Sequence, residues 1–364
     1  IILNGAPRTL LGDENKTELM RKVGVNLPQM SLLTHELKQM GIIKKVDPLL
    51  TIEGYAKVLA EDLKEGGREK VLGKTEARKR EKVLGKETTR EPIVKVEGLT
   101  HIYPGGVVAL IGVNLEIYAG ELVAFIGQNG SGKTTLVKHF NGLLKPSEGK
   151  VIVDGIDTRE VDIADLSKIV GLTFQNPDRQ IFNLSVRKEV ELGLKKLRLE
   201  EDEKKKRVLE ALEAVGLKHA IDIPTFSLSL GERQRLTLAS VLVMNPKVIV
   251  VDEPTTGQDL RMRLEIMDLL KEINNKGRTV IIVTHDMDLV AKYAERCVVM
   301  HAGRIIADGP THVVLSKMEI LESTRLRPPE IARFSLEMGS YGIPMNFLTV
   351  EEAISFIKEA HRFG

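Results

Sequence analysis

Residues 127–134 read Gly-Gln-Asn-Gly-Ser-Gly-Lys-Thr, directly after the apolar run Leu-Val-Ala-Phe-Ile at 122–126. The apolar run predicts a short buried strand, and the glycine-rich turn after it predicts a helix that begins at Lys133. Glycines let successive backbone N–H groups and the helix N-terminus point at phosphate oxygens. A chance glycine-rich turn is the alternative, but the strand before it and the helix after it favour a phosphate-binding loop.

In such a loop, individual side chains have defined tasks. Lys133 would reach the β- and γ-phosphates of a nucleotide, and the hydroxyl of Thr134 would bind Mg²⁺. The residues that we expect to contact the nucleotide are Gly127, Asn129, Gly130, Ser131, Gly132, Lys133, Thr134 and Thr135. The loop therefore predicts a site for ATP and Mg²⁺, and it leaves the kind of ATPase open.

A second apolar run, at 248–251, ends in Asp252-Glu253-Pro254. It predicts another buried strand. An acidic residue at a strand end can hold Mg²⁺ through water, and a second one beside it can activate the attacking water. We therefore expect Asp252 to bind the metal and Glu253 to act as the general base.

Three further motifs complete an ordered set. Between the two strands lies Leu228-Ser229-Leu230-Gly231-Glu232-Arg233-Gln234-Arg235. After the second strand come Thr256-Gly257-Gln258-Asp259 and then an apolar run at 280–283 that ends in Thr284-His285-Asp286. In this order and spacing, the motifs resemble those of the ATP-binding-cassette (ABC) family. The resemblance covers about residues 93–312.

The resemblance implies a role for each matching residue. Tyr103 stands where the family stacks an aromatic ring on adenine. Gln175 matches the glutamine that contacts Mg²⁺ and the attacking water and that senses the transport subunit. Asp252 and Glu253 match the metal-binding aspartate and the general base, and His285 matches the histidine that contacts the γ-phosphate. Glu253, His285 and Gln175 are thus the expected catalytic residues.

Other matches imply a pair of cassettes. Ser229 and Gly231 correspond to the signature motif, which binds the γ-phosphate of the ATP held by the opposite subunit through a helix N-terminus. Asp259 falls in the D-loop. Two departures from the family pattern are Leu230, where glycine is usual, and a D-loop that reads Thr-Gly-Gln-Asp rather than Ser-Ala-Leu-Asp. The resemblance implies a head-to-tail dimer that buries two ATP molecules.

The composition narrows the class of protein. The 364 residues include 53 Lys and Arg against 51 Asp and Glu, so the net charge of +2 gives no basic footprint for nucleic acid. The single cysteine, Cys297, excludes a disulfide framework within one chain, and its apolar surroundings predict a core strand. No apolar run approaches the length of a membrane span and no signal peptide is visible, so a membrane subunit would be a separate chain.

An internal repeat predicts how the chain is organised. Four stretches recur in the same order: Ile1-Ile2-Leu3-Asn4-Gly5 as Ile305-Ile306-Ala307-Asp308-Gly309, Leu27-Pro28-Gln29-Met30 as Pro328-Pro329-Glu330-Ile331, Met40-Gly41 as Met338-Gly339, and Leu50-Thr51-Ile52-Glu53 as Leu348-Thr349-Val350-Glu351. Two unrelated amphipathic segments are the alternative. We expect residues 1–63 to be the tail of a preceding cassette, 64–91 a charged linker, 92–312 the ABC ATPase domain and 313–364 a C-terminal helical extension.

Two stretches indicate a subfamily. Residues 175–182 read Gln-Asn-Pro-Asp-Arg-Gln-Ile-Phe, and the extension contains a Pro-Pro break followed by Leu-Thr-Val-Glu-Glu. Both resemble the ATPases of energy-coupling factor transporters, which take up vitamins and transition metals. The resemblance implies a second cassette, a transmembrane coupling subunit and a substrate-binding membrane protein as partners, and a location at the cytoplasmic face of the membrane. It leaves the transported substrate open.

A soluble ABC ATPase that acts on ribosomes or nucleic acid is the alternative function. The near-neutral charge argues against it, and so does the short separation of Lys133 and Leu228, which leaves room only for the ordinary helical subdomain. The predicted fold is α/β. It comprises a P-loop core of the RecA type, an antiparallel β flank near 93–126, a helical signature subdomain near 180–245 and the C-terminal helical extension.

Overall fold

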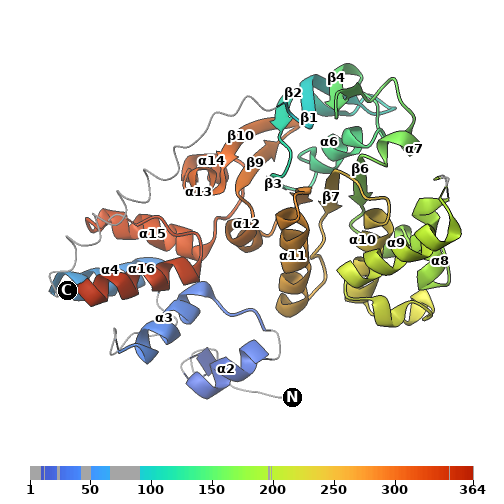
Figure 1. Cartoon of the computed structure of the whole chain (residues 1–364). Helices are drawn as coiled ribbons and strands as arrows, with labels where there is room; N and C mark the ends of the chain where they lie inside the picture. Colours follow the sequence, from blue (N-terminus) through green and yellow to red (C-terminus); the bar gives the residue numbers. More distant parts are fainter. Residues whose placement is uncertain are drawn as a thin grey trace. The chain divides into compact units, whose positions relative to one another are not determined.

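The structure is a computed structural model that describes residues 10–11, 13–22, 25–41, 51–65, 91–195, 197, 199–343 and 345–363. The chain forms two units (Figure 1): Arg90–Pro310, and Ile1–Thr89 together with Thr311–Gly364. In the described part of the chain, no helix combines the length and the apolar character that crossing a bilayer requires.

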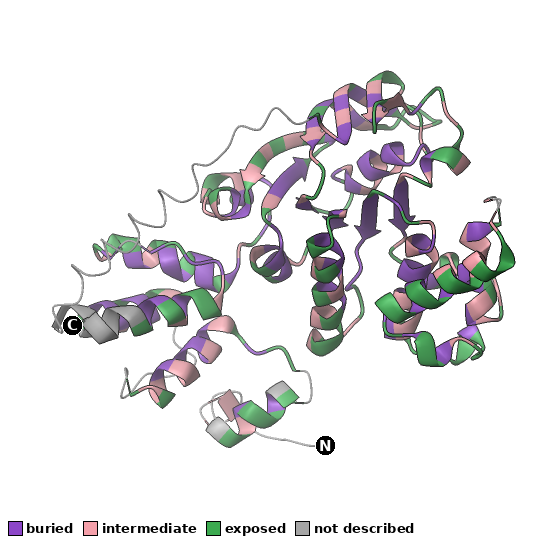
Figure 2. Cartoon of the chain, viewed as in Figure 1, coloured by how far each residue is buried: buried purple, intermediate pink, exposed green. Residues whose placement is uncertain are grey.

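A six-stranded sheet forms the centre of the Arg90–Pro310 unit, in the order β10-β9-β3-β8-β7-β6. The neighbours from β9 to β6 are parallel, and β10 adds an antiparallel edge. The strands are β3 (Leu122–Ile126), β6 (Val170–Thr173), β7 (Val248–Asp252), β8 (Thr279–Val283), β9 (Arg296–His301) and β10 (Arg304–Pro310). Strands β3, β7 and β8 are buried along their whole length (Figure 2), as expected of parallel strands covered on both faces. Cys297 lies buried in β9, which confirms the predicted core position.

Three strands of this sheet end side by side. In β8, Val283 pairs with Phe125 of β3 and with Asp252 of β7. Strand β3 leads into α6 (Lys133–Phe140), β7 into α11 (Leu260–Asn275) and β8 into α12 (Met287–Tyr293). In an open parallel sheet, the loops after the carboxyl ends of the strands form the binding edge. The phosphate-binding loop, the Asp-Glu pair and His285 therefore meet at one edge.

A second, antiparallel sheet has the order β2-β1-β4-β5. Its strands are β1 (Val94–Ile102), β2 (Val108–Ile117), β4 (Glu148–Val153) and β5 (Ile156–Asp157). The sequence predicted this flank near 93–126, but β3 belongs to the large sheet, and β4 and β5 complete the flank. One apolar core joins the two sheets, with Leu99 of β1 and Phe125 of β3 fully buried in it. The core fixes β3, and with it the start of the phosphate-binding loop.

Between the neighbouring strands β6 and β7, the chain forms a helical region. It contains α8 (Val186–Glu191), α9 (Glu201–Ala214) and α10 (Leu230–Leu242), together with short 3-10 turns at Pro177–Arg179, Leu192–Leu194, Lys218–Ala220 and Thr225–Ser227. It matches the helical subdomain predicted near 180–245. A further short helix, α7 (Ile163–Leu166), precedes β6.

The other unit is helical. It contains α2 (Glu14–Lys22), α3 (Gln29–Gln39), α4 (Ile52–Glu65), α13 (Thr311–Leu315), α14 (Met318–Ser323), α15 (Glu330–Ser340) and α16 (Val350–Phe363). The last four form the predicted C-terminal helical extension. Helix α4 continues to Glu65, and the rest of the predicted linker, residues 66–90, lies outside the described residues, as does the repeat stretch at 1–5.

Candidate functional site

The turn from β3 to α6 has the backbone that the motif predicts. Gly127 has φ +155°, and a Cβ atom there would lie 2.3 Å from the carbonyl oxygen of Met300. Gly132, the residue before α6, has φ +104°. Gly130 also has a positive φ, +79°, but a Cβ there would meet nothing within 4 Å. The first two glycines are thus required by the fold, whereas Gly130 leaves an open face beside the helix N-terminus.

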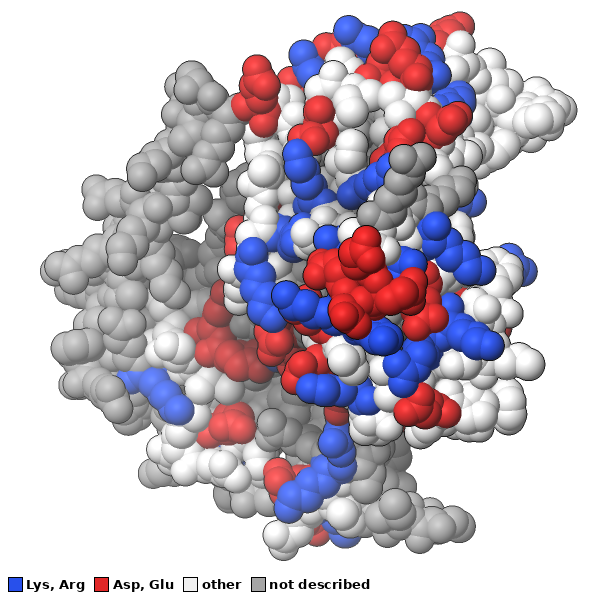
Figure 3. Space-filling view, turned by 45° about the vertical axis from the view of Figure 1, so that its right-hand side comes forward, with Lys and Arg blue, Asp and Glu red and all other residues white. Residues whose placement is uncertain are grey.

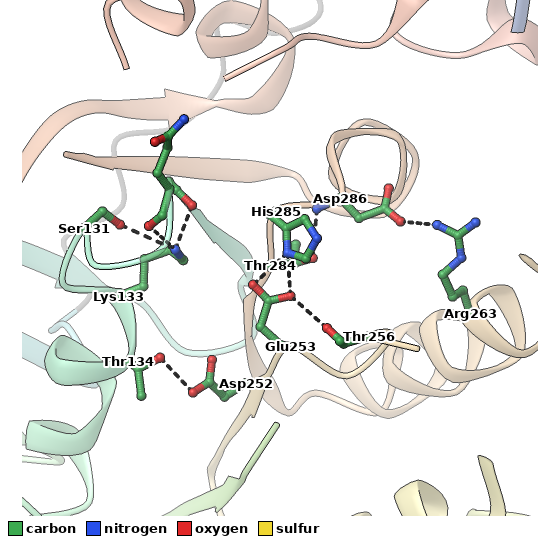
Figure 4. A network of polar contacts seen from close by, with 12 residues as sticks. Ser131, Lys133, Thr134, Asp252, Glu253, Thr256, Arg263, Thr284, His285 and Asp286 are labelled. Atoms are coloured by element: carbon green, nitrogen blue, oxygen red, sulfur yellow. Dashed lines mark hydrogen bonds and ion pairs between the residues drawn. The ribbon is translucent and has the colours of Figure 1, made fainter. Parts of the chain in front are cut away.

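Lys133 lies folded over this loop. Its Nζ donates hydrogen bonds to the carbonyl oxygens of Gly127 at 2.7 Å and Gln128 at 2.9 Å (Figure 4). The residue is only 6% exposed, and this burial lowers its pKa, although the nearby carboxylates of Glu253 and Asp252 oppose the shift. A poorly hydrated ammonium group interacts strongly with an anion that approaches it. The position suits the neutralisation of phosphate charge.

Thr134 and Asp252 join the loop to the end of β7. The Thr134 hydroxyl donates a hydrogen bond of 2.8 Å to Oδ2 of Asp252 (Figure 4). Burial raises the pKa of Asp252, and the hydrogen bond from Thr134 opposes that rise. The second carboxylate oxygen, Oδ1, is buried and has no hydrogen-bond partner among the described residues.

An orphaned carboxylate oxygen beside a threonine hydroxyl fits Mg²⁺. This ion is usually held by one or two carboxylates, waters and substrate phosphates rather than by a cage of protein ligands. The described residues contain no group of three or more His, Cys, Asp or Glu side chains that could hold a metal ion. Thr134 and Asp252 could hold the ion together with waters and the phosphates of a nucleotide.

Glu253 is held in place by contacts with Val283, His285 and Thr256. Its backbone has φ +51°, its N–H donates to the carbonyl oxygen of Val283, and the residue as a whole is 8% exposed. Its carboxylate lies between two donors (Figure 4): Nδ1 of His285 lies 2.8 Å from Oε2, and the Thr256 hydroxyl lies 3.4 Å from the same oxygen. The carboxylate is therefore oriented before any substrate binds. Sequence reasoning did not identify Thr256 as part of this arrangement.

A second set of contacts holds the loop that carries His285. Asp286 caps α12 by accepting a hydrogen bond from the N–H of Leu289, and its other carboxylate oxygen accepts one of 2.6 Å from Arg263 of α11. Sequence reasoning missed Arg263, because residues 263 and 286 belong to no common motif. An aspartate directly after a strand and before a helix is the available signal for the cap.

Tyr103, the residue predicted to stack on adenine, is held in place by contacts with the phosphate-binding helix. The Tyr103 hydroxyl lies 3.1 Å from Oγ1 of Thr135, and the Tyr103 ring contacts the ring of His101 edge-on at 4.6 Å. His101 in turn lies 3.1 Å from His139 of α6, and burial lowers the pKa of His139 to about 4. The two histidines, which sequence reasoning did not single out, connect the Tyr103 region to the phosphate-binding helix.

Gln175 lines the same cleft as Thr134 and Asp252. This cleft, of about 770 Å³, is lined by Thr134, Lys138, Phe174, Gln175, Asn176, Pro177, Asp178, Arg179, Leu230, Gln234, Asp252 and Thr256. The structure thus brings Gln175 to the same cleft as Thr134 and Asp252. Of the expected nucleotide contacts on the phosphate-binding loop, Asn129 is exposed and Ser131 is buried.

The signature motif takes a different position. Ser229 is exposed and caps α10 through a reciprocal capping box with Glu232. Neither Ser229 nor Gly231 lines the cleft, although Leu230 between them does. Asp259 caps α11 by accepting a hydrogen bond of 2.9 Å from the N–H of Met262. Within one cassette, Ser229 is therefore exposed at the N-terminus of α10, Gly231 is buried in its first turn, and neither lines the cleft that contains Asp252.

Leu230 of the signature motif and Gly257 of the D-loop, which belong to the two departures from the family pattern, lie close together. A Cβ atom on Gly257 would lie 3.9 Å from Cδ2 of Leu230. The leucine of the signature motif therefore lies near a glycine of the D-loop, and it is 38% exposed. A methyl group at 257 would make only an ordinary contact with Leu230, so the positive φ of Gly257, +77°, is what favours glycine there.

Comparisons with known proteins agree with this geometry. The family model described as ABC transporter matches residues 110–256. The energy-coupling factor transporter ATP-binding protein EcfA2 of Clostridium tetani is 41% identical over 271 residues, which are 71% of this chain and 94% of that protein. A Caldanaerobacter subterraneus protein named as an ABC transporter ATP-binding protein is 40% identical over 361 residues, which are 98% of this chain and 60% of that protein. This chain spans 58% to 60% of the length of the first three curated relatives.

Solved structures are similar as well. CbiO1 from Clostridium perfringens, part of the ABC transporter complex CbiONQ, has a TM-score of 0.59 at 42% identity and covers 66% of this chain and 98% of its own. The ATP-binding cassette MJ0796, in a dimer bound to ADP and phosphate, has a TM-score of 0.54 at 34% identity and covers 60% of this chain and 98% of its own. Because this chain covers 94% of the 41% identical relative from Clostridium tetani, it belongs to the ATP-binding proteins of ABC transporters.

Proposed function

We propose that this chain hydrolyses ATP and that the hydrolysis powers an uptake transporter of the energy-coupling factor class. The observation that carries the proposal is the edge of the large sheet where Thr134 and Asp252, with its orphaned oxygen, lie beside an oriented Glu253. Relatives named energy-coupling factor ATP-binding proteins, 41% to 44% identical to this chain, support the transporter class.

The chemistry follows from the positions of the side chains. Mg²⁺, held by Thr134, Asp252 and Gln175 together with the phosphates, would supply positive charge to the transferring phosphoryl group. Lys133 adds a second charge from the loop. Glu253 accepts a proton from the water that attacks the γ-phosphorus, and the bond to the bridging oxygen breaks to release ADP. His285 orients the Glu253 carboxylate.

A second cassette completes the site in this proposal. Ser229 and Gly231 would contact the γ-phosphate of an ATP bound by the partner cassette, and Asp259 would lie in the same interface. Their support is the exposed position of Ser229 at the N-terminus of α10 and the dimeric state of the similar cassette MJ0796. Tyr103 would stack on the adenine, above its anchor at Thr135.

An exposed apolar surface, part of which follows Gln175 in the chain by seven to nine residues, favours a membrane partner. Phe182 and Leu184 are each 77% exposed, and Phe226 is 73% exposed. Backbone hydrogen bonds bring their segments together, because the N–H of Thr225 donates to the carbonyl oxygen of Leu184. Large exposed apolar groups gathered in one place mark interaction sites. We place the transmembrane coupling subunit here, and the chain accordingly at the cytoplasmic face of the membrane.

A buried carboxylate holds this apolar surface in shape. Oε2 of Glu189 accepts hydrogen bonds from the N–H groups of Phe182 at 3.0 Å and Asn183 at 2.8 Å, and from the Asn183 side chain at 2.9 Å. Glu189 is only 2% exposed. The segment that follows Gln175 is thus tied to α8, so movement at Gln175 would reach the surface proposed for the membrane subunit.

The charge pattern supports a transporter over the nucleic-acid alternative. On the face shown in Figure 3, Lys and Arg side chains alternate with Asp and Glu. Helix α9 illustrates the mixing, since Lys204 pairs with Glu201 and Arg207 pairs with Glu203. A nucleic-acid footprint needs clustered positive charge instead.

Replacement of Glu253 by glutamine tests the proposed hydrolysis. We expect Glu253→Gln to lower ATP turnover by about 10²–10⁴-fold, because a general base contributes on that order, while ATP binding is retained. Glu265→Gln, at an exposed position on α11, is the matched control and should keep full turnover. Turnover of Glu253→Gln at the wild-type rate would contradict the assignment of Glu253.

The membrane partner requires a separate test. The chain would be co-expressed with the transmembrane coupling subunit of its own organism and purified in detergent. We expect Phe182→Ser with Phe226→Ser to lose the partner, whereas Val107→Ser, which alters an exposed apolar residue in the β1–β2 turn, should retain it. Equal retention by all variants would remove this surface from the proposal.

A further inference from the structure

Helices α3 and α15 are built alike. Each has 11 residues and begins after a proline, Pro28 or Pro329, that supplies no side-chain cap. Each is followed by a glycine with positive φ, Gly41 at +69° and Gly342 at +81°. The structural counterpart of Gly41 is therefore Gly342, which corrects the sequence alignment of the repeat that paired Gly41 with Gly339.

The two helices also bury the same positions. The buried residues of α3 are Met30, Ser31, Leu33, Thr34 and Leu37, and those of α15 are Ile331, Ala332, Phe334, Ser335 and Met338. Taken in order, they match one to one, with apolar, small, apolar, hydroxyl-bearing and apolar side chains. The helices that follow, α4 and α16, have 14 residues each. The likeness therefore extends over both helices of each copy.

The contacts between the copies are reciprocal. The N–H of Met30 donates to Oε2 of Glu330 at 3.4 Å, and the N–H of Ile331 donates to Oε1 of Gln29 at 2.9 Å. The first residue of each helix thus caps an N–H group of the other helix, where the prolines leave the N-termini without local caps. An interface in which residue i of one copy contacts j of the other, and j contacts i, has twofold symmetry.

Packing follows the same exchange. Helix α3 packs on α16, and α4 packs on α15. All four helices share one apolar core, in which Leu33, Leu59, Phe334 and Ile357 are buried. The helix starts correspond too, because the hydroxyl of Thr51 accepts from the N–H of Gly54 at 3.2 Å and that of Thr349 accepts from Glu352 at 3.2 Å.

We propose that residues 29–65 and 330–363 are two copies of one tail, paired about a pseudo-twofold axis. The face of α15 and α16 that α3 and α4 cover is then a pairing surface whose occupant is a second copy of the tail. In this chain the occupant is supplied by the same polypeptide. Two cassettes that carry such tails are held together at this surface without nucleotide. The inference does not depend on the chemistry proposed for Glu253.

Cleavage between the copies tests the pairing in the full chain. A protease site would be placed between residues 66 and 90, and masses would be measured by native mass spectrometry without nucleotide. We expect the N-terminal piece to stay bound after cleavage of the wild type. Leu33→Asp puts a charge into the shared core, so the piece should leave and the larger piece should dimerise through its uncovered tail. Gln39→Asp, on the exposed side of α3, should behave as the wild type.

Two results would overturn the inference: loss of the wild-type piece on cleavage, or a larger piece from Leu33→Asp that stays monomeric. If Leu33→Asp does not fold, a chimera decides. Its α3 carries the 11 residues of α15, and a control chimera carries the same residues in reverse order. We expect the N-terminal piece of the first chimera to remain bound after cleavage and that of the control to leave. Equal behaviour of the two chimeras would show that α3 and α15 are not equivalent.

Discussion

His285 reaches across from the end of β8 to Glu253 at the end of β7, so that its Nδ1 lies 2.8 Å from Oε2 and 3.0 Å from Oε1 of the carboxylate. The two side chains differ in exposure, because that of Glu253 is 9% exposed and that of His285 is 62% exposed. The histidine therefore contacts the buried Glu253 carboxylate and also reaches the open side of the site, where a phosphate would approach. Its proposed task is to position Glu253.

Removal of the His285 ring should slow catalysis more than it weakens binding. The lost hydrogen bond to a charged group is worth about 1.5–3 kcal/mol, so we expect His285→Ala to lower kcat by roughly 10–100-fold with little change in KM for ATP. His285→Gln, whose amide can still donate to Glu253, should recover part of kcat. Steady-state kinetics of the two variants make the comparison. An equal loss in both would argue against a positioning role.

The buried negative charge of Asp252 should destabilise the folded chain. Burial raises the pKa of this carboxyl, so the ionised form destabilises the folded chain at every pH above the ordinary aspartate value of about 3.9. We expect Asp252→Asn to raise Tm at pH 7 without nucleotide, by about 2–4 °C for each kcal/mol relieved, and to gain less as the pH falls toward 4. Calorimetry across this pH range measures the effect.

The control for Asp252→Asn is Asp202→Asn, whose side chain is 99% exposed in an ion pair at the start of α9. Its Tm should differ little from that of the wild type. A lower Tm for Asp252→Asn at pH 7 would contradict the destabilising effect of the buried charge. The same variant should also bind ATP with less dependence on Mg²⁺, which isothermal titration with and without the ion would reveal.

The site was predictable where its residues sit in local motifs. Lys133, Thr134, Asp252 and Glu253 follow buried apolar runs directly, so strand ends and helix starts could be placed from the sequence, and parallel pairing brings them together. Arg263 was not predictable, since its contact with Asp286 depends on how α11 lies beside α12. Local patterns carry no such information.

The repeat shows the same limit. Its existence was visible in the sequence, but the register failed at Gly41, because the connection after α3 is longer than the one after α15 and the dipeptide Met-Gly recurs by coincidence at 338–339. That one copy packs against the other could not be read from either copy alone, since the buried positions of an amphipathic helix do not name what covers them. Glu189 was missed for a similar reason, as glutamates are rarely buried.

Loss of the Glu189 carboxylate should uncouple the apolar surface from the ATP site. Glu189→Ala leaves three donors of residues 182 and 183 without their acceptor, so we expect weaker binding of the transmembrane subunit together with nearly unchanged ATP affinity. Glu189→Gln keeps one acceptor oxygen and should retain more of the partner. Co-purification in detergent, alongside nucleotide titration, separates the two effects. A parallel loss of ATP affinity would indicate a general defect of folding instead.

The two glycines of the phosphate-binding loop should fail in different ways when a methyl group is added. In Gly127→Ala, the new Cβ would lie 2.3 Å from the Met300 carbonyl oxygen, and β9 cannot yield because it is paired with β3. We expect a large fall in Tm, since overpacking alone costs about 1–3 kcal/mol and the backbone at φ +155° adds strain.

In Gly130→Ala, the Cβ meets nothing, so only the strain at φ +79°, about 1–2 kcal/mol, remains. Its methyl group stands on the face proposed for the phosphates, so ATP affinity should fall while most of the stability is kept. Thermal melts and nucleotide titrations of both variants distinguish them, and equal falls in Tm would mean that the Met300 contact does not constrain the loop.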